Sequence, residues 1–151
     1  MALTQLQLQL LEVSKKAALE LGENGRRLTD LIGELSACHY LDLTWKPSDG
    51  YDALAKNSER IQIKSRKSWT TEGVNPSGRL GKFGRKAGYQ FDKGIYLELD
   101  QFFEISGIWE MPMPKIRELE DKEKGGKGLH VRTFRSNARQ LWTHSAGFDI
   151  K

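Results

Sequence analysis

Two short runs of sequence decide the fold, Gly50-Tyr51-Asp52-Ala53-Leu54 and Arg60-Ile61-Gln62-Ile63-Lys64-Ser65, with a polar turn at residues 56–59 between them. In the second run, Ile61 and Ile63 alternate with polar residues, which is the period of a β-strand with one apolar and one polar face. The turn between the runs favours a tight reversal of the chain. The sequence therefore predicts a β-hairpin over residues 50–65.

The hairpin also brings three polar side chains together. It carries Asp52 on its first strand toward Gln62 and Lys64 on its second, so a carboxylate, an amide oxygen and an ammonium are expected in one small volume. Mg²⁺ prefers oxygen ligands and is commonly held by one or two carboxylates and several waters. A nearby lysine can orient or help deprotonate one of those waters. A polar strand face in solvent is the alternative interpretation of the same pattern.

Gly50-Tyr51-Asp52 followed by Gln62-Ile63-Lys64 resembles the PD-(D/E)XK nuclease superfamily, in the variant with Gln in place of Glu, as in Mrr-like restriction endonuclease domains. Pro47-Ser48-Asp49 also imitates the "PD" half, but Asp52 fits the strand better. The resemblance implies a phosphodiesterase that acts on DNA with Mg²⁺ or Mn²⁺. It implies that Asp52 is the chief metal carboxylate, that Gln62 is a neutral oxygen ligand, and that Lys64 positions the attacking water.

A glutamate on the preceding helix extends this resemblance. Residues 28–40 are predicted to form an amphipathic helix, and Glu34 lies at the edge of its apolar stripe, beside Leu31 and Cys38. In the superfamily, a glutamate on the helix before the first strand often contributes to the metal site, and Gly33-Glu34-Leu35 looks like that element. The resemblance thus implies that Glu34 is an auxiliary catalytic acid and a third metal ligand. A solvated glutamate at a helix border is the alternative.

Composition limits the class of protein. The chain has 151 residues, 38% hydrophobic and 29% charged, with one cysteine and a net charge of +4. These values predict a single globular domain over residues 1–151, with residues 1–25 as a helical accessory. No apolar run approaches the length of a membrane helix and no signal peptide is recognisable, so we expect a cytoplasmic protein with no membrane partner. One cysteine excludes an internal disulfide.

Basic residues crowd the segment after the hairpin. This segment is rich in glycine, contains few acids, and interleaves its positive charges with Trp69, Phe83 and Tyr89. A local positive field with aromatic side chains is typical of a nucleic-acid surface, although the aromatic rings would equally pin the segment to the core. The residues predicted to bind nucleic acid are Arg66, Lys67, Arg79, Lys82, Arg85 and Lys86.

The remaining elements follow from periodicity. Residues 3–21 are predicted to form an amphipathic helix with the stripe Leu3, Leu6, Leu10, Val13, Ala17 and Leu21. Whether this helix is the face of a homodimer or an added layer on the core is left open. Strands are predicted at residues 41–45, 95–99, 102–111 and 129–134, and further helices at residues 115–124 and 137–144.

Together these elements predict an α/β fold, a restriction-endonuclease-like sandwich with a central mixed β-sheet flanked by helices. The resemblance covers residues 28–99, and the core helix expected after the Gln-x-Lys strand is not evident there. The leading hypothesis is a Mg²⁺-dependent DNA endonuclease of restriction or phage-defence type. The alternatives are a nuclease-like DNA-binding module with little or no catalysis, and a protein-interaction subunit that uses the N-terminal helix.

Overall fold

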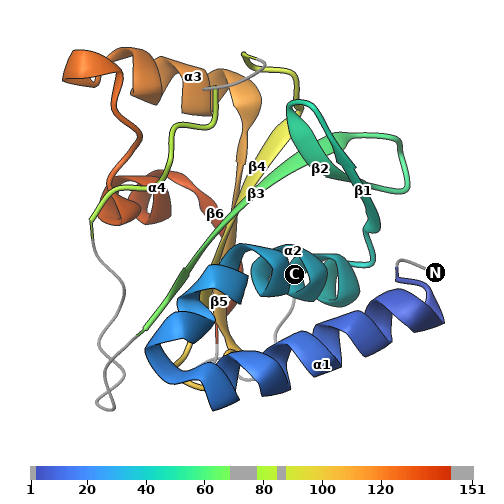
Figure 1. Ribbon diagram of the computed structural model, residues 1–151. Helices are drawn as coiled ribbons and strands as arrows, with labels where there is room; N and C mark the ends of the chain where they lie inside the picture. The colour runs from blue at the N-terminus through green and yellow to red at the C-terminus, as the bar shows by residue number, and fades with distance from the viewer. Residues whose placement is uncertain (1–2, 69–77, 85–87, 144–151) are drawn as a thin grey trace.

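The protein is built around one mixed sheet of six strands (Figure 1). The computed structural model describes residues 3–68, 78–84 and 88–143. The strands lie side by side in chain order, and all neighbours are antiparallel except β3 and β4, which are parallel. They are β1 (Thr44–Ser48), β2 (Tyr51–Leu54), β3 (Arg60–Lys67), β4 (Lys93–Leu99), β5 (Ile105–Pro112) and β6 (Arg139–Thr143).

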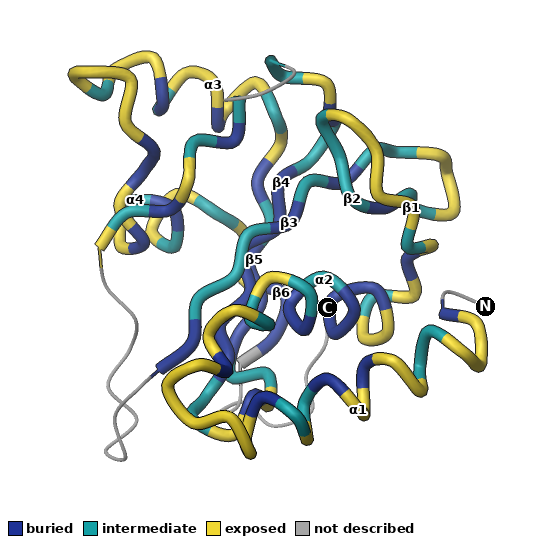
Figure 2. The backbone as a smooth tube through the Cα atoms, in the orientation of Figure 1, coloured by how far each residue is buried: buried dark blue, intermediate teal, exposed yellow. Residues whose placement is uncertain are grey.

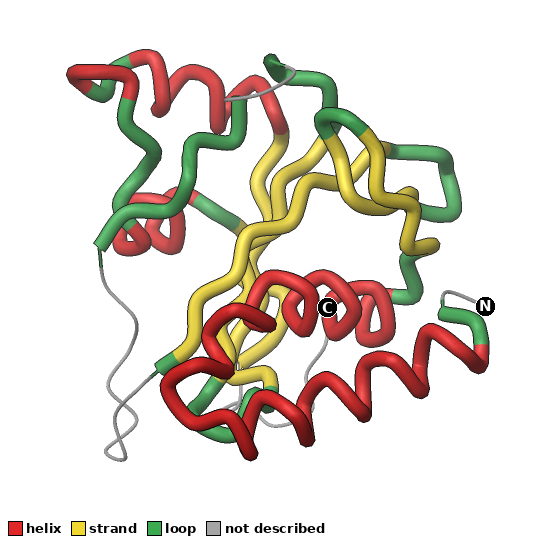
Figure 3. The backbone as a smooth tube through the Cα atoms, viewed as in Figure 1, coloured by secondary structure: helices red, strands yellow, loops and turns green. Residues whose placement is uncertain are grey.

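Helices cover both faces of this sheet (Figures 1 and 3). On one face lie α1 (Gln5–Leu21), the short 3₁₀ helix η1 (Gly22–Leu28) and α2 (Thr29–Leu41). On the other lie α3 (Met113–Asp121), the 3₁₀ turn η2 (Lys124–Gly126) and α4 (Val131–Asn137). The expected α/β class, with a mixed sheet flanked by helices, is therefore confirmed.

Each face of the sheet has its own hydrophobic core. On the α2 side, Ile32 of the helix packs with Ile61 and Ile63 of β3. On the other side, Phe83 and Phe134 stack with ring centroids 5.5 Å apart. Burial is concentrated along the central strands, whereas α1 is largely exposed (Figure 2). The alternation predicted for β3 is thus real, because its isoleucines face α2 and its even-numbered residues face the second core.

The helix α1 confirms a predicted element, whose orientation the sequence left open. It begins after Thr4, whose side chain and that of Gln7 form a reciprocal capping box, and it ends before Gly22. Its buried residues are Leu11, Ser14 and Ala18. Beyond Leu3 the predicted stripe lies mostly in solvent, because the helix packs on α2 through a smaller and less apolar face.

The strand and helix predicted for the C-terminal part are wrong. Residues 129–134 were expected to be a strand, but Val131–Asn137 forms α4, and residues 137–144 were expected to be a helix, but Arg139–Thr143 forms β6. Pairing of β6 with the edge of β5 outweighs the modest helix propensity of that segment. The strand predicted at residues 41–45 forms later, as β1, because α2 continues to Leu41.

The segment between β3 and β4 is held by its aromatic residues. Phe83 is buried, and the hydroxyl of Tyr89 donates to Glu120 of α3 at 2.9 Å. These rings therefore pin the chain to the core, while Trp69 lies outside the described residues. Residues 78–84 and 88–92 contain no helix, in agreement with the sequence. None of the helices in the described ranges has the length and apolar character to cross a membrane.

Candidate functional site

Asp52 lies where the pairing of β2 with β3 stops. The two strands are in register at Ala53 with Ile61 and at Leu54 with Arg60. One step further, the N–H of Ile63 donates to Oδ2 of Asp52 at 2.8 Å, in the place of a bond to a backbone carbonyl. The carboxylate is therefore fixed against β3, as the hairpin predicted.

Gln62 and Lys64 project from β3 on the face opposite the isoleucines. The amide oxygen Oε1 of Gln62 is buried and has no hydrogen-bond partner among the described residues. An unpartnered buried oxygen is costly, so such an atom calls for an explanation. The ammonium of Lys64 lies 5.8 Å from the centre of the Phe83 ring. A Cβ atom at Gly81 would lie 3.4 Å from that ammonium, so residues 78–84 pass directly over Lys64.

Glu34 approaches this region from α2. The indole N–H of Trp45 on β1 donates to Oε1 of Glu34 at 3.1 Å, which fixes the side chain. The helix can lie close to β3 because Gly33 has no side chain, since a Cβ atom there would be 2.3 Å from Oγ of Ser65. One glycine therefore permits the close packing that brings Glu34 toward the sheet.

The two carboxylates and the lysine share one electrostatic environment. Burial, followed by the charge of Asp52, raises the pKa of Glu34 to about 7, against the opposing hydrogen bond from Trp45. Burial also raises the pKa of Asp52, while the Ile63 amide and the charge of Lys64 oppose that shift. The charge of Lys64 also lowers the pKa of Glu34. Two half-buried carboxylates within electrostatic range of one another favour a positive charge nearby.

Sequence reasoning missed Asp30. This residue lies one turn before Glu34 on α2, and its negative charge raises the pKa values of both Glu34 and Asp52. The four-residue spacing, which places Asp30 and Glu34 on one side of the helix, was the signal available in the sequence. Trp45 was also missed, because no local pattern links an indole to a glutamate on another element.

The residues fit a hard divalent cation with few protein ligands. Among the residues that the structure describes, His, Cys, Asp and Glu side chains form no group of three or more that could hold a metal ion. The remaining donor set is Asp52, Glu34 and the Gln62 oxygen. Mg²⁺ commonly takes one or two carboxylates and keeps several waters, so this set suits Mg²⁺ or Mn²⁺ better than a metal that needs histidine or thiolate ligands.

The predicted nucleic-acid residues fall into different surroundings. Arg66 and Lys82 are partly exposed, and Arg66 follows Lys64 on the same face of β3. Lys67 is only 7% exposed, with its ammonium 4.7 Å from the centre of the Phe103 ring, so it belongs to the packing of the fold. Arg79 forms an ion pair with Glu123 and donates to the carbonyl of Gly128. Arg85 and Lys86 lie outside the described residues.

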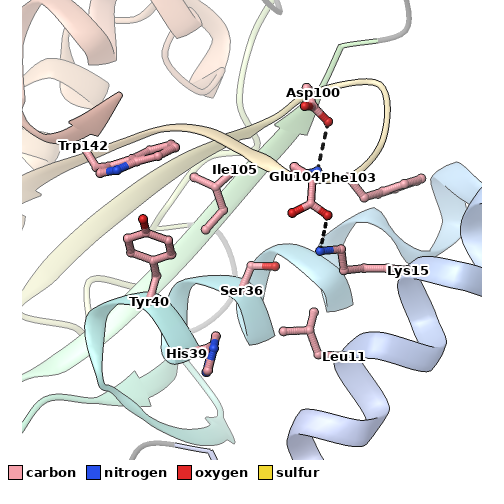
Figure 4. Close-up of a pocket in the computed structure, with 10 residues that line it drawn as sticks. All are labelled: Leu11, Lys15, Ser36, His39, Tyr40, Asp100, Phe103, Glu104, Ile105 and Trp142. Carbon is pink, nitrogen blue, oxygen red and sulfur yellow. Dashed lines mark hydrogen bonds and ion pairs between the residues drawn. The ribbon is translucent and has the colours of Figure 1, made fainter. Parts of the chain in front are cut away.

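A pocket away from these residues lies between α1, α2 and the β4–β5 turn (Figure 4). Its volume is about 430 Å³, and Trp142 and Ile105 form part of its apolar wall. Lys15 and Glu104 form an ion pair across its rim, so these two charges largely neutralise each other. Both carboxylates in its lining are engaged within the fold, since Asp100 accepts the N–H groups of Phe102 and Glu104, and Glu104 pairs with Lys15.

No protein-family model matches the chain, and no curated protein matches it. The class of the molecule therefore comes from its own architecture. It is an α/β protein with a six-stranded mixed sheet. Its candidate site consists of Asp52, Gln62 and Lys64 on the hairpin strands, with Glu34 of α2 within electrostatic range of Asp52 and Lys64.

Proposed function

We propose that this protein is a Mg²⁺-dependent DNA endonuclease of the PD-(D/E)XK type, in the Gln variant. Restriction or defence against phage is the biological role that such an activity would serve. The observation that carries the proposal is the buried Gln62 oxygen without a hydrogen-bond partner, next to the carboxylate of Asp52. A metal ligand is one explanation for such an atom, and the adjacent carboxylates supply the negative charge that a cation needs.

The proposed mechanism assigns one role to each side chain. Asp52 and Glu34 would hold the cation with the Gln62 oxygen, and Lys64 would orient the attacking water and offset phosphate charge in the transition state. The bound metal supplies Lewis-acid activation of the scissile phosphate. Without a cation, the Glu34 pKa of about 7 lets its carboxylate hold a proton near neutral pH, and a bound cation would displace that proton. Trp45 keeps the Glu34 carboxylate oriented through its hydrogen bond.

The order of elements supports the proposed restriction-endonuclease-like sandwich. The helix α2 is followed by the antiparallel strands β1, β2 and β3, and β4 then lies parallel to β3. The chain order of Glu34, Asp52, Gln62 and Lys64 agrees with the pattern that the sequence suggested. One feature departs from the superfamily pattern. The described residues between β3 and β4, 78–84 and 88–92, contain no helix.

A DNA-binding module without catalysis is the second candidate. Gln62 is neutral, so the proposed site has one negative charge less than a site with glutamate at this position. A weaker cation site would leave the basic face around Arg66 and Lys82 able to bind DNA without cutting it.

The test is plasmid cleavage with Mg²⁺ or Mn²⁺, together with DNA affinity measured by fluorescence anisotropy. We expect metal-dependent cleavage, and Lys64→Ala should lower turnover at least tenfold more than it lowers DNA affinity. Lys122→Ala, which removes an exposed lysine after α3, is the charge-matched control. Equal losses in turnover and affinity would make Lys64 a simple phosphate contact. DNA binding with no cleavage by the wild type in either metal would favour the binding module.

A further inference from the structure

A buried carboxylate binds the backbone of the segment that passes over Lys64. Glu120 of α3 is only 1% exposed. Its Oε2 accepts the backbone N–H of Phe83 at 2.7 Å, and its Oε1 accepts that of Gly84 at 3.4 Å. Two successive N–H groups that converge in this way make an anion-binding concavity. The segment of residues 78–84 is therefore attached to α3 through the Glu120 carboxylate.

Tyr89 completes the set of donors to Glu120. Its hydroxyl donates to Oε1 at 2.9 Å, and burial together with this hydrogen bond raises the pKa of Tyr89, so the hydroxyl keeps its proton. None of the ion pairs within the described ranges involves Glu120. Hydrogen bonds to an ionised group are roughly twice as strong as neutral ones, so these three bonds make a firm anchor.

Phe83 links this carboxylate to the proposed site. Its backbone N–H binds Glu120, and the centre of its ring lies 5.8 Å from the Lys64 ammonium, within the range of a cation–π contact. Two residues earlier, a Cβ atom at Gly81 would lie 3.4 Å from the same ammonium and 4.0 Å from Cε of Lys64. The lysine thus lies against a segment that Glu120 holds.

The start of the segment is fixed by contacts that do not involve Glu120. The N–H of Leu80 donates to the carbonyl of Leu129 at 2.8 Å. Within the described part of the chain, the hydrogen bonds of residues 81–84 are those to Glu120. Glu120 is therefore the hydrogen-bond anchor of the part of the segment that lies against Lys64.

We propose that Glu120 is a positioning residue for the proposed site, because its carboxylate holds residues 81–84 against Lys64. The inference rests on the proposed nuclease function, in which Lys64 orients the attacking water. A displacement of about 1 Å at a catalytic group can lower the rate about 100-fold. The proposed cation ligands Asp52 and Gln62 form none of the hydrogen bonds of Glu120, so loss of the anchor should lower turnover and spare cation affinity.

Glu120→Gln tests the anchor with little change in side-chain volume. An amide has a single acceptor oxygen, so it cannot accept on both sides as the carboxylate does. We expect turnover in the plasmid assay to fall at least about tenfold, while Mg²⁺ affinity measured by calorimetry stays near the wild-type value. Glu118→Gln makes the same change at an exposed position of α3 and should leave turnover unchanged.

An NMR contact reports the position of the segment without DNA or metal. The Gly81 Hα proton that takes the place of a Cβ atom lies close to the Hε protons of Lys64, so the two should give an NOE in the wild type and in Glu118→Gln. This NOE should be lost in Glu120→Gln. A purely structural role would lower the unfolding temperature and leave both the NOE and the turnover of folded protein intact. Either a retained NOE or an unchanged turnover in Glu120→Gln would therefore overturn the proposal.

Tyr89→Phe is the milder variant, and it decides the question if Glu120→Gln does not fold. It removes one donor and leaves the carboxylate with its two backbone bonds. The NOE should weaken and turnover should fall severalfold, and wild-type values of both would overturn the proposal. A wild type that cuts no DNA would count against the proposed nuclease, and the NOE alone would then decide whether Glu120 holds residues 81–84 against Lys64.

Discussion

At the scale of single residues, Asp52 has two roles that a substitution must separate. Its carboxylate is the proposed metal ligand, and it also accepts the backbone N–H of Ile63. Removing the acceptor leaves a partly buried donor unsatisfied, which costs about 1–3 kcal/mol. Asp52→Ala would therefore destabilise the fold as well as the site.

Asp52→Asn is the cleaner substitution. It keeps an oxygen that can accept from Ile63 and removes the negative charge. We expect metal-dependent cleavage to fall at least about 100-fold, because even the loss of a hydrogen-bond partner of a metal ligand typically costs about 10–100-fold in activity. The melting temperature should stay close to that of the wild type. Cleavage assays and thermal unfolding check the two parts, and full activity in Asp52→Asn would remove Asp52 from the site.

Substitutions of Gln62 distinguish an amide that binds the metal from an amide that contacts DNA or the backbone. If its oxygen binds the cation, Gln62→Leu should lose Mg²⁺ affinity and Gln62→Glu should recover or exceed the wild-type affinity, because a carboxylate adds charge to the ligand set. Calorimetry without DNA measures this directly. Normal metal affinity with lowered DNA affinity in Gln62→Leu would show that the amide contacts DNA or the backbone instead.

The part of the candidate site on the hairpin follows from the sequence, and the rest depends on tertiary contacts. Period-two alternation places Gln62 and Lys64 on one face, and chain order places Asp52 next to them. The same rule puts Lys67 on the face of Ile61 and Ile63, where it is indeed buried, so its assignment to a nucleic-acid surface neglected the alternation. The bond from Trp45 to Glu34 joins β1 to α2, and no periodicity predicts it.

At the scale of elements, the contact between α2 and β3 positions Glu34. Gly33→Ala should destabilise the protein by about 1–3 kcal/mol, because its Cβ atom would overlap Ser65. Alanine is otherwise the better helix former, so a loss of stability has a steric cause. Ser65→Gly removes the obstructing side chain, and the double variant should recover part of the loss. Urea unfolding of the two single variants and the double variant measures this coupling, and additive effects would contradict the steric explanation.

The elements that the sequence predicts best are those whose periodicity and end signals agree. The hairpin, α2 and the apolar strand β4 combine a clear period with suitable end signals. The segment from residue 129 lacks that agreement, because Leu129, Val131 and Phe134 fit an alternating strand at first and a helical spacing afterwards. Only the packing of Val131 and Phe134 into the second core, and the pairing of β6 with β5, decide the outcome.

At the scale of the whole molecule, the proposed DNA contact lies where the polar side chains of β3 meet the segment of residues 78–84. Gln62, Lys64 and Arg66 follow one another on one face of β3, about 6–7 Å apart along the strand, and the segment with Gly81 and Lys82 passes over it.

This arrangement predicts the salt dependence of DNA binding. Arg66 follows Lys64 on the same face of β3, Lys82 follows Gly81 in the segment over Lys64, and both are partly exposed, so the variant Arg66→Gln/Lys82→Gln should remove two phosphate contacts. Each contact contributes about 0.9 to the slope of log affinity against log salt concentration, and the slope should fall by about 1.8.

Lys122→Gln/Lys124→Gln makes the same change of net charge at exposed positions after α3 and should leave the slope near the wild-type value. Fluorescence anisotropy on a short duplex over a salt series provides both slopes. An equal fall in the two double variants would indicate a general charge effect, and an unchanged slope in Arg66→Gln/Lys82→Gln would place DNA on another face of the molecule.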